Sequence, residues 1–465
     1  MTAAIRPVLA EGPATAPLAT LEPFDIAHPT HIALVESETA FWGLVRKEQL
    51  ADALAGGELL ESLRAKAEIF GREMDLLRFG LKPSAVYFNP TERCNLNCSY
   101  CYIPEAMRSG GAQMDRATVL AALDRLHSYF RGHMPAERLP QVIFHGAEPL
   151  LAREAIFAGI EAYGDRFRFG VQTNATLLDE AAIAFLTDRG VGIGLSLDGP
   201  IAAVADRTRR RWNGDGVFDQ VVRAIDRLKG YPGFNVICTM TSENLPHLTA
   251  MVDFLHEHQV PACMLNVTRC TLAGARNVRG SDDDVAQAYL AALERAHALY
   301  RTSGRKLVVA NFANILIAIL APTARRLMCD ISPCGGGRSF FALAPDGSLF
   351  PCSEFIGLPA FAGGNLFRQP IEEILDSPPF RLVSGRRIEQ VEGCNTCPIR
   401  HFCGSPCPAE AYEMNGGMER KGAFCRFYEE QVRYALRLIA DGRHEDFLWE
   451  GWDEGTETLC SIGAA

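Results

Sequence analysis

Three cysteines, Cys94, Cys98 and Cys101, fall within eight residues of one segment, NPTERCNLNCSYCY. Thiolates bind the irons of a four-iron, four-sulfur (4Fe–4S) cluster, which normally takes four of them. A run of three cysteines without a nearby fourth leaves one iron for another ligand, so it favours a catalytic cluster over a structural one. Zinc is the alternative, although zinc sites usually combine Cys-X2-Cys pairs from two halves into four closed ligands.

Most of the other cysteines gather in a second group nearer the C-terminus, at ligand-like spacings such as Cys-X2-Cys. This group consists of Cys329, Cys334, Cys352, Cys394, Cys397, Cys403, Cys407 and Cys425. Such clustering in a long chain indicates metal binding in a reducing compartment, and not a disulfide framework. A pair of zinc knuckles is the alternative. Four cysteines belong to neither group: Cys238, Cys263, Cys270 and Cys460.

Composition limits the class of protein. The chain has 465 residues, 48% of them hydrophobic, and a formal net charge of −10. An acidic chain argues against a nucleic-acid partner, because such binding depends on clustered Lys and Arg, and the basic run 207–211 is short. The longest apolar run, 307–322, falls short of a membrane span, and the N-terminus lacks the apolar segment of a signal peptide. We therefore expect a cytoplasmic protein with no nucleic-acid or membrane partner.

Alternating strand and helix patterns begin just before the first cysteine group and continue for more than two hundred residues. We expect strands at 85–89, 141–145, 168–173, 192–197, 235–239 and 262–267, and helices at 115–130, 179–189, 219–229 and 245–258. This repeat predicts an α/β fold with parallel strands. In such folds the chemistry lies at the carboxyl ends of the strands, so these elements would position the reacting groups.

The first cysteine group, with the aromatic Tyr100 before its last cysteine, resembles the Cys-X3-Cys-X2-Cys signature of the radical S-adenosylmethionine (SAM) superfamily. The resemblance implies a partial (β/α)6 barrel and a 4Fe–4S cluster whose open iron chelates SAM. One electron from the reduced cluster would cleave SAM to methionine and a 5′-deoxyadenosyl radical. That radical would abstract hydrogen from a substrate carbon.

Motifs at the expected strand ends match positions that hold SAM in this superfamily. Gly146-Ala147-Glu148-Pro149 is similar to the family's Gly-Gly-Glu-Pro motif, which holds the SAM amino group through its backbone and carboxylate. Ala147 departs from the pattern, which matters only if that position needs a positive φ or very close ligand approach. Arg209 resembles the arginine that pairs with the SAM carboxylate, a role that suits a fork of donors. Further positions matching the ribose and carboxylate contacts are Gln172, Asn174, Ser196 and Asp198.

The C-terminal group matches the seven-cysteine SPASM pattern at every spacing. The match implies a first auxiliary 4Fe–4S cluster held by Cys334, Cys352 and Cys407, with Cys329 as a candidate fourth ligand. It implies a second auxiliary cluster held by Cys394, Cys397, Cys403 and Cys425. Three 4Fe–4S clusters are expected in all. If Cys329 closes the first auxiliary cluster, electron transfer is favoured there over binding of a substrate sulfur.

The region before the barrel predicts a separate module. Residues 1–22 are rich in Ala and Pro without periodicity, so we expect a mobile arm. Two strand-like runs at 31–36 and 39–45 and a helical run at 47–54 then indicate a small winged α+β module over 23–83. It resembles leader-recognition elements of peptide-modifying enzymes, where a precursor segment adds a strand to a sheet edge. A plain packing domain is the alternative.

We expect the barrel to cover 84–320, the SPASM domain 321–440 and a tail 441–465. These features predict a radical SAM oxidoreductase that modifies a ribosomally made precursor peptide and takes electrons from a donor such as flavodoxin or ferredoxin. We favour oxidative cross-linking, because two auxiliary clusters suit removal of an electron from the substrate. Epimerisation would need a hydrogen donor, for which Cys263 and Cys270 are the candidates.

Two further classes stay open. The chain also resembles anaerobic sulfatase-maturating enzymes, which oxidise Cys or Ser to formylglycine with an Asp base directly after the cysteine equivalent to Cys352. Here Ser353 and Glu354 follow instead, so Glu354 is the candidate base, provided that the backbone is shifted. A cluster-bearing electron carrier that is no enzyme is the third class, and the complete set of SAM motifs disfavours it.

Overall fold

The computed structural model describes residues 21–56, 61 and 71–453. A ten-stranded sheet forms the body of the protein, in the order β10-β9-β8-β7-β6-β5-β4-β11-β12-β13. Its strands are β4 (Ala85–Phe88), β5 (Gln141–Phe144), β6 (Arg168–Thr173), β7 (Gly192–Ser196), β8 (Phe234–Met240), β9 (Ala262–Val267), β10 (Val308–Val309), β11 (Phe340–Leu343), β12 (Ser348–Phe350) and β13 (Gly364–Asn365). From β10 to β11 all neighbours are parallel, while β12 and β13 join antiparallel.

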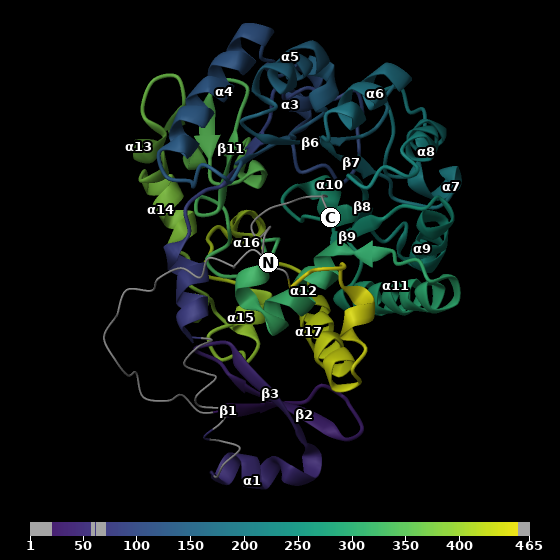
Figure 1. The fold of residues 1–465 in the computed structure, drawn as a ribbon, viewed down its shortest axis with the longest axis vertical. Helices are drawn as coiled ribbons and strands as arrows, with labels where there is room; N and C mark the ends of the chain where they lie inside the picture. The colour runs from purple at the N-terminus through teal and green to yellow at the C-terminus, as the bar shows by residue number, and fades with distance from the viewer. Residues whose placement is uncertain (1–20, 57–60, 62–70, 454–465) are drawn as a thin grey trace.

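Helices cover the outer side of this sheet (Figure 1). They are α4 (Arg116–Arg131), α5 (Arg153–Tyr163), α6 (Glu180–Asp188), α7 (Ala202–Ala205), α8 (Phe218–Arg227), α9 (Leu248–Glu257) and α11 (Asp282–Ser303). Three further helices, α3 (Glu105–Gly110), α10 (Ala273–Asn277) and α12 (Ala310–Leu320), lie on the inner side or at the strand ends. The starts of α4 and α6 follow Asp115 and Asp179, whose carboxylates accept hydrogen bonds from backbone N–H groups three residues on. The expected βα repeat is confirmed, and the six strands β4 to β9 form the partial barrel.

The cysteine-rich C-terminal part shares the same sheet. Strand β11 pairs in parallel with β4, so the cysteine-rich part extends the barrel at its first strand. Its helices are α13 (Ile371–Leu375), α14 (Pro378–Ser384), α15 (Arg400–Cys403), α16 (Pro408–Asn415) and α17 (Cys425–Ala440). Helix α17 packs against α11 and α12 of the barrel part, with the ring of Phe427 5.1 Å from that of Tyr289.

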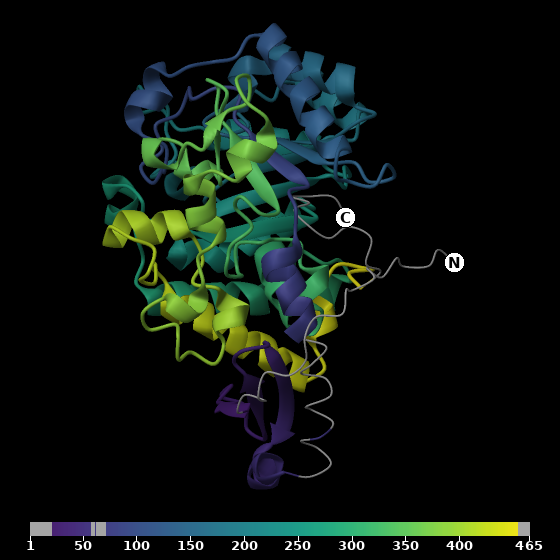
Figure 2. The ribbon, with the colours of Figure 1, turned by 90° about the vertical axis from the view of Figure 1, so that its left-hand side faces the viewer.

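A separate three-stranded antiparallel sheet lies at the other end of the molecule, next to α15 and α17 (Figures 1 and 2). It consists of β1 (Leu21–Phe24), β2 (His31–Glu36) and β3 (Phe41–Arg46), and α1 (Leu50–Ala55) follows. The expected hairpin is confirmed, and β1 adds a strand that we did not expect. Its first two residues fall inside the segment that we assigned to the arm. The rest of that arm, and Cys460, lie outside the described residues.

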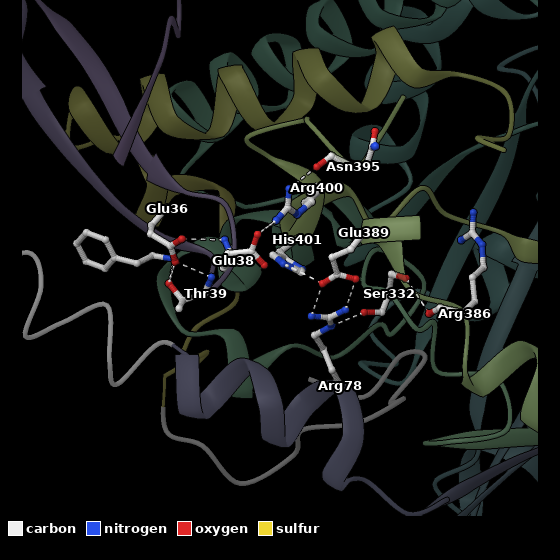
Figure 3. A network of polar contacts seen from close by, with 11 residues as sticks. Glu36, Glu38, Thr39, Arg78, Ser332, Arg386, Glu389, Asn395, Arg400 and His401 are labelled. Carbon is white, nitrogen blue, oxygen red and sulfur yellow. Dashed lines mark hydrogen bonds and ion pairs between the residues drawn. The ribbon is translucent and has the colours of Figure 1, made fainter. Parts of the chain in front are cut away.

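Polar contacts fix this sheet, and the segment before β4, to the rest of the protein; Figure 3 shows those of Glu38 and Arg78. At the turn between β2 and β3, Glu38 Oε1 lies 2.6 Å from Arg400 Nη2 of α15. The indole of Trp42 in β3 donates to the carbonyl of Ile319 at 2.7 Å. Just before β4, Arg78 lies 2.8 Å from Glu389 and donates to the carbonyl of Ser332. Across the described residues, every helix is too short or too polar to cross a membrane.

Candidate functional site

A cavity of about 410 Å³ lies at the carboxyl ends of the barrel strands. All three cysteines of the first group line it, together with four from the C-terminal group, Cys329, Cys334, Cys352 and Cys407. Two cysteine groups more than two hundred residues apart in sequence therefore line one cavity. That arrangement can bring a reactive cofactor and an electron acceptor to the same substrate.

The first cysteine loop is held in place by its backbone. Cys94 N–H donates to the Arg108 carbonyl at 2.9 Å, and Asn97 N–H donates to the Arg210 carbonyl at 2.7 Å. Burial raises the pKa of Cys94 to about 12 and that of Cys98 to about 11. Buried thiols ionise readily only next to positive charge, and the irons of a cluster supply it. The donor set thus fits a cluster at this position.

A buried chain of polar groups joins Tyr100, Asp198 and Arg209. Tyr100 donates to Asp198 Oδ2 at 2.5 Å, and Arg209 Nη1 donates to the Tyr100 oxygen at 2.5 Å. Arg209 lines the cavity, and its Nε–H is buried with no partner. An unpartnered guanidinium N–H on a cavity wall fits an incoming carboxylate, such as that of SAM. Asp198 itself is turned away from the cavity and holds the arginine.

The Gly146–Pro149 motif is divided between two roles. Gly146 has a φ of +109°, and a Cβ there would come within 2.8 Å of the Asn89 side chain. Both Gly146 and Ala147 line the cavity, so the extra methyl group of Ala147 is accommodated. We expected the Glu148 carboxylate to face the ligand. It instead accepts hydrogen bonds from Leu150 N, Thr173 Oγ1 and Asn174 N, at 3.0, 2.8 and 2.8 Å.

Glu148 and Pro149 are thus not on the cavity wall. Pro149 begins a short 3-10 helix, and the Glu148 carboxylate caps it. The carboxylate also fixes the end of β6, which places Asn174 beside the cluster loop. Asn174 Nδ2 lies 3.7 Å from Cys94 Sγ. Three further residues that we expected to contact SAM also line the cavity: Gln172, Asn174 and Ser196.

The C-terminal cysteines form two sets. Cys329, Cys334, Cys352 and Cys407 share the cavity wall, and the exposed surface of Cys329 faces that cavity. Around Cys403, burial raises the pKa of the thiol, and the neighbouring Cys394, Cys397 and Cys425 raise it further. In the part of the chain that the structure describes, no three Cys, His, Asp or Glu side chains are close enough together to bind a single metal ion.

Arg269 and Glu354 lie close together on the cavity wall. Arg269 Nε lies 3.9 Å from Glu354 Oε1, while Glu354 Oε2 is buried with no partner. Burial raises the pKa of Glu354 to about 7, and Arg269 opposes the shift. Tyr428 lines the same wall. Sequence reasoning missed Arg269 and Tyr428, although Arg269 follows the end of β9, where site residues gather in the other strands.

The cysteines that we considered as hydrogen donors are elsewhere. Cys263 is fully buried at the start of its strand, and Cys270 points its sulfur toward the Thr268 carbonyl. Neither lines the cavity. Cys238 is also fully buried in the core, as expected of a small apolar side chain.

Comparison with known proteins identifies the family. A model of the radical SAM superfamily matches residues 88–255, and one of an iron–sulfur cluster-binding domain, SPASM, matches residues 334–398. An uncharacterized protein of Archaeoglobus fulgidus is 39% identical over 87% of this chain and 91% of its own length. The chain belongs to the radical SAM superfamily. It is a radical SAM enzyme with a SPASM domain, and SAM and iron–sulfur clusters are its cofactors.

Characterised relatives of this radical SAM enzyme include the cysteine-type anaerobic sulfatase-maturating enzyme of Clostridium perfringens, 24% identical over 77% of this chain and 98% of its own. The structure of anSMEcpe with bound AdoMet and the Cp18Cys peptide matches with a TM-score of 0.67 and 21% identity, over 78% of this chain and 99% of the other. Streptococcus suis SuiB bound to its precursor peptide SuiA matches with a TM-score of 0.56 and 12% identity, over 87% and 99%. These structural likenesses concern the fold.

Proposed function

We propose that this radical SAM enzyme modifies a ribosomally made precursor peptide by oxidative cross-linking. The observation that carries the proposal is the combination of a cavity lined by two cysteine sets with a separate sheet fixed to the cysteine-rich domain. The cavity supplies a place for the reaction, and the sheet supplies a place for the part of the peptide that does not react.

Three 4Fe–4S clusters are proposed, one for each cysteine set. Cys94, Cys98 and Cys101 would hold the SAM-binding cluster, which when reduced supplies the electron that cleaves SAM into a hydrogen-abstracting radical. The four cysteines that share the cavity with them would hold the first auxiliary cluster. The remaining set, Cys394, Cys397, Cys403 and Cys425, would hold the second. The protein itself orients SAM through Arg209 and closes the cavity against water.

The small N-terminal sheet is proposed to bind the leader of the precursor. Among the described residues β3 has β2 as its only strand partner, so an added strand can pair with its other edge. The opposite edge strand, β1, contains Pro23, which has no N–H to donate. The match to SuiB, whose structure holds a precursor peptide, covers 87% of this chain, against 78% for anSMEcpe. The precursor peptide in the SuiB structure supports a peptide as the substrate.

Oxidative cross-linking is favoured over epimerisation because the second reaction needs a hydrogen donor. Cys263 and Cys270 are turned away from the cavity, which removes the two candidates. Four cysteines at the cavity wall instead suit an electron acceptor close to the substrate, with Cys329 as the fourth ligand of its cluster. We therefore propose that the substrate radical is oxidised as the new bond forms, with loss of two hydrogens in all.

Sulfatase maturation is the second candidate. The similarity to sulfatase-maturating enzymes supports it, and so does the position of Glu354, two residues after Cys352 on the cavity wall. A carboxylate there with one unpartnered oxygen can accept the proton of a substrate thiol or hydroxyl. Glu354 would then do the work of the Asp base, which directly follows the equivalent cysteine in those enzymes.

The deciding experiment uses the short open reading frames beside the gene. Each encoded peptide is incubated with reduced enzyme and SAM, and its mass is measured afterwards. Loss of two hydrogens from one of them supports the cross-link, whereas an unchanged mass with deuterium uptake would show epimerisation. Conversion of a sulfatase peptide to formylglycine, with no change in any neighbouring peptide, would establish the second candidate instead.

A further inference from the structure

The outer side of the Cys94 loop carries a group of positive side chains with no assigned role. Loop residues 208–211 run beside the cluster loop: Ser99 N–H donates to the Thr208 carbonyl, and Leu96 forms a bridge with Arg211. Arg211 Nη2 also donates to Gln220 Oε1 at 2.6 Å, which joins this loop to helix α8. On α8, Arg223 and Arg227 are exposed one turn apart. We call Arg210, Arg211, Trp212, Arg223 and Arg227 the arginine face.

A groove of about 770 Å³ continues the arginine face. Gln220, Arg223 and Arg227 form one wall, and the first turns of α4 and α5 form the other, with Arg116 and Arg153. Three carboxylates line it too, Asp115, Glu154 and Asp179, and of these Asp179 has an arginine partner in the groove. Asp115 caps α4, while Asp179 caps α6 and pairs with Arg153 at 2.6 Å. Four arginines, Arg116, Arg153, Arg223 and Arg227, against these three carboxylates leave the groove with one excess positive charge, on a chain whose net charge is −10.

Single side chains separate this surface from the Cys94 loop. Trp212, 40% exposed, donates its indole N–H to the Cys94 carbonyl at 2.9 Å. From the groove, Thr176 accepts a hydrogen bond from Asn95 Nδ2 at 2.8 Å, next to Cys94. On its other side, Cys94 lines the cavity at the strand ends. An electron for this cluster has to come from a protein at the outer surface, because a cavity of about 410 Å³ admits no protein.

We propose that the arginine face and its groove dock a small acidic one-electron carrier of the flavodoxin or ferredoxin class. The inference rests on the proposed function only in that Cys94, Cys98 and Cys101 hold a reducible cluster. In each transfer the carrier is oxidised by one electron and the cluster is reduced by one, from the 2+ to the 1+ state, and no bond is made or broken. Charge complementarity favours this surface, because arginines outnumber carboxylates in the groove of a chain that is acidic overall.

The test compares carrier-driven with chemical reduction. Affinity of the reconstituted enzyme for oxidised flavodoxin is measured at low and moderate salt, and the rate of cluster reduction is followed by its EPR signal, with reduced flavodoxin, reduced ferredoxin or dithionite. Arg223→Glu/Arg227→Glu should weaken binding and slow carrier-driven reduction by about tenfold or more at low salt. Arg223→Gln/Arg227→Gln should lie between this variant and the native enzyme. Reduction by dithionite should not change.

The matched control is Arg125→Glu/Arg131→Glu. Both arginines are exposed on α4, toward the end of that helix away from the groove. Equal carrier binding by the native enzyme and the Arg223/Arg227 variants, or an equal loss in the control, would overturn the docking surface. Dithionite-driven SAM cleavage by the native enzyme separates the two proposals, because its absence would refute the cluster assignment while its presence leaves only the docking site in question.

Discussion

Glu38 and Arg400 connect the small N-terminal sheet to the cysteine-rich part of the protein. Their side chains lie 2.6 Å apart, with Arg400 almost fully buried and Glu38 largely exposed. Glu38 lies at the turn between β2 and β3, and Arg400 lies between Cys397 and Cys403. The proposed leader sheet is thus held directly against the loop of a proposed cluster.

Replacing Glu38 with Gln should separate peptide handling from SAM chemistry. Gln keeps an oxygen that can accept from the buried Arg400 guanidinium, and Arg400 also donates to the Asn395 carbonyl, so the enzyme should stay folded. Turnover of the full precursor should fall several-fold, while SAM cleavage without peptide stays constant. Glu48→Gln, which removes a contact of 3.7 Å with Arg46 on the exposed side of the same module, is the control. Full precursor turnover by Glu38→Gln would show that this contact has no part in peptide delivery.

Anaerobic reconstitution should give about twelve irons per chain, as three four-iron clusters. The triple variant with Ala at 94, 98 and 101 should keep about eight irons and lose all reductive SAM cleavage. Cys238→Ala, which changes a buried thiol outside the three sets, should keep all twelve. The measurements are iron and sulfide content and the yield of 5′-deoxyadenosine. Cleavage that survives in the triple variant would be incompatible with the assignment.

Arg209→Gln should weaken SAM binding by about 10- to 100-fold, because a charged hydrogen bond contributes about 1.5–3 kcal/mol. Iron content should be unchanged, since no cysteine is touched. Isothermal titration with SAM measures the effect. Arg207→Gln is the control, because Arg207 pairs with Glu243 at the surface. A normal SAM affinity in Arg209→Gln would place the SAM carboxylate elsewhere.

The pH dependence of peptide turnover should report Glu354 if that residue is the base. Burial raises its pKa to about 7, and only the ionised form, present above that pKa, can accept a proton. The rate should therefore rise with pH and level off above about 7, and Glu354→Gln should be slow at every pH. Iron content and uncoupled SAM cleavage should match those of the native enzyme. If the turnover rate of Glu354→Gln still rises with pH, another group is responsible for that rise.

Cys263→Ala and Cys270→Ala should both form the same peptide product as the native enzyme. Their side chains are buried away from the cavity, so neither can reach a substrate radical. Mass spectrometry in deuterated water checks the result. Loss of the native product in either variant, with a peptide whose radical has received no hydrogen, would support epimerisation instead.

Local patterns in the sequence predicted the elements that depend on neighbouring residues. The six strands and their helices follow from runs of apolar residues and caps such as Asp179, and the cysteine spacings mark the two cysteine-rich regions. The direction of the Glu148 side chain could not be predicted in this way. It depends on backbone groups of Leu150 and Asn174, and the second of these directly follows another strand, β6.

The residues that form the cavity wall opposite the SAM motifs could not be predicted as a group from the sequence either. Arg269, Glu354 and Tyr428 come from three distant segments, and no spacing relates them to one another. The four cysteines at this wall could be recognised by their pattern, but their sharing of one cavity with Cys94 depends on the pairing of β11 with β4. A single sequence carries no local signal for a pairing across such a distance.

The pairing of Ala85 with Phe340 also sets an order of events during synthesis. At about 5–20 residues per second, the ribosome synthesises Phe340 more than ten seconds after Ala85. During that time β4 can pair with β5 but not with β11. The cysteines at 94, 98 and 101 emerge in the same interval, before the wall of the cavity exists. Iron and sulfide could therefore be delivered while this loop is still open to the cell's assembly proteins, and completion of the sheet would then enclose the cluster.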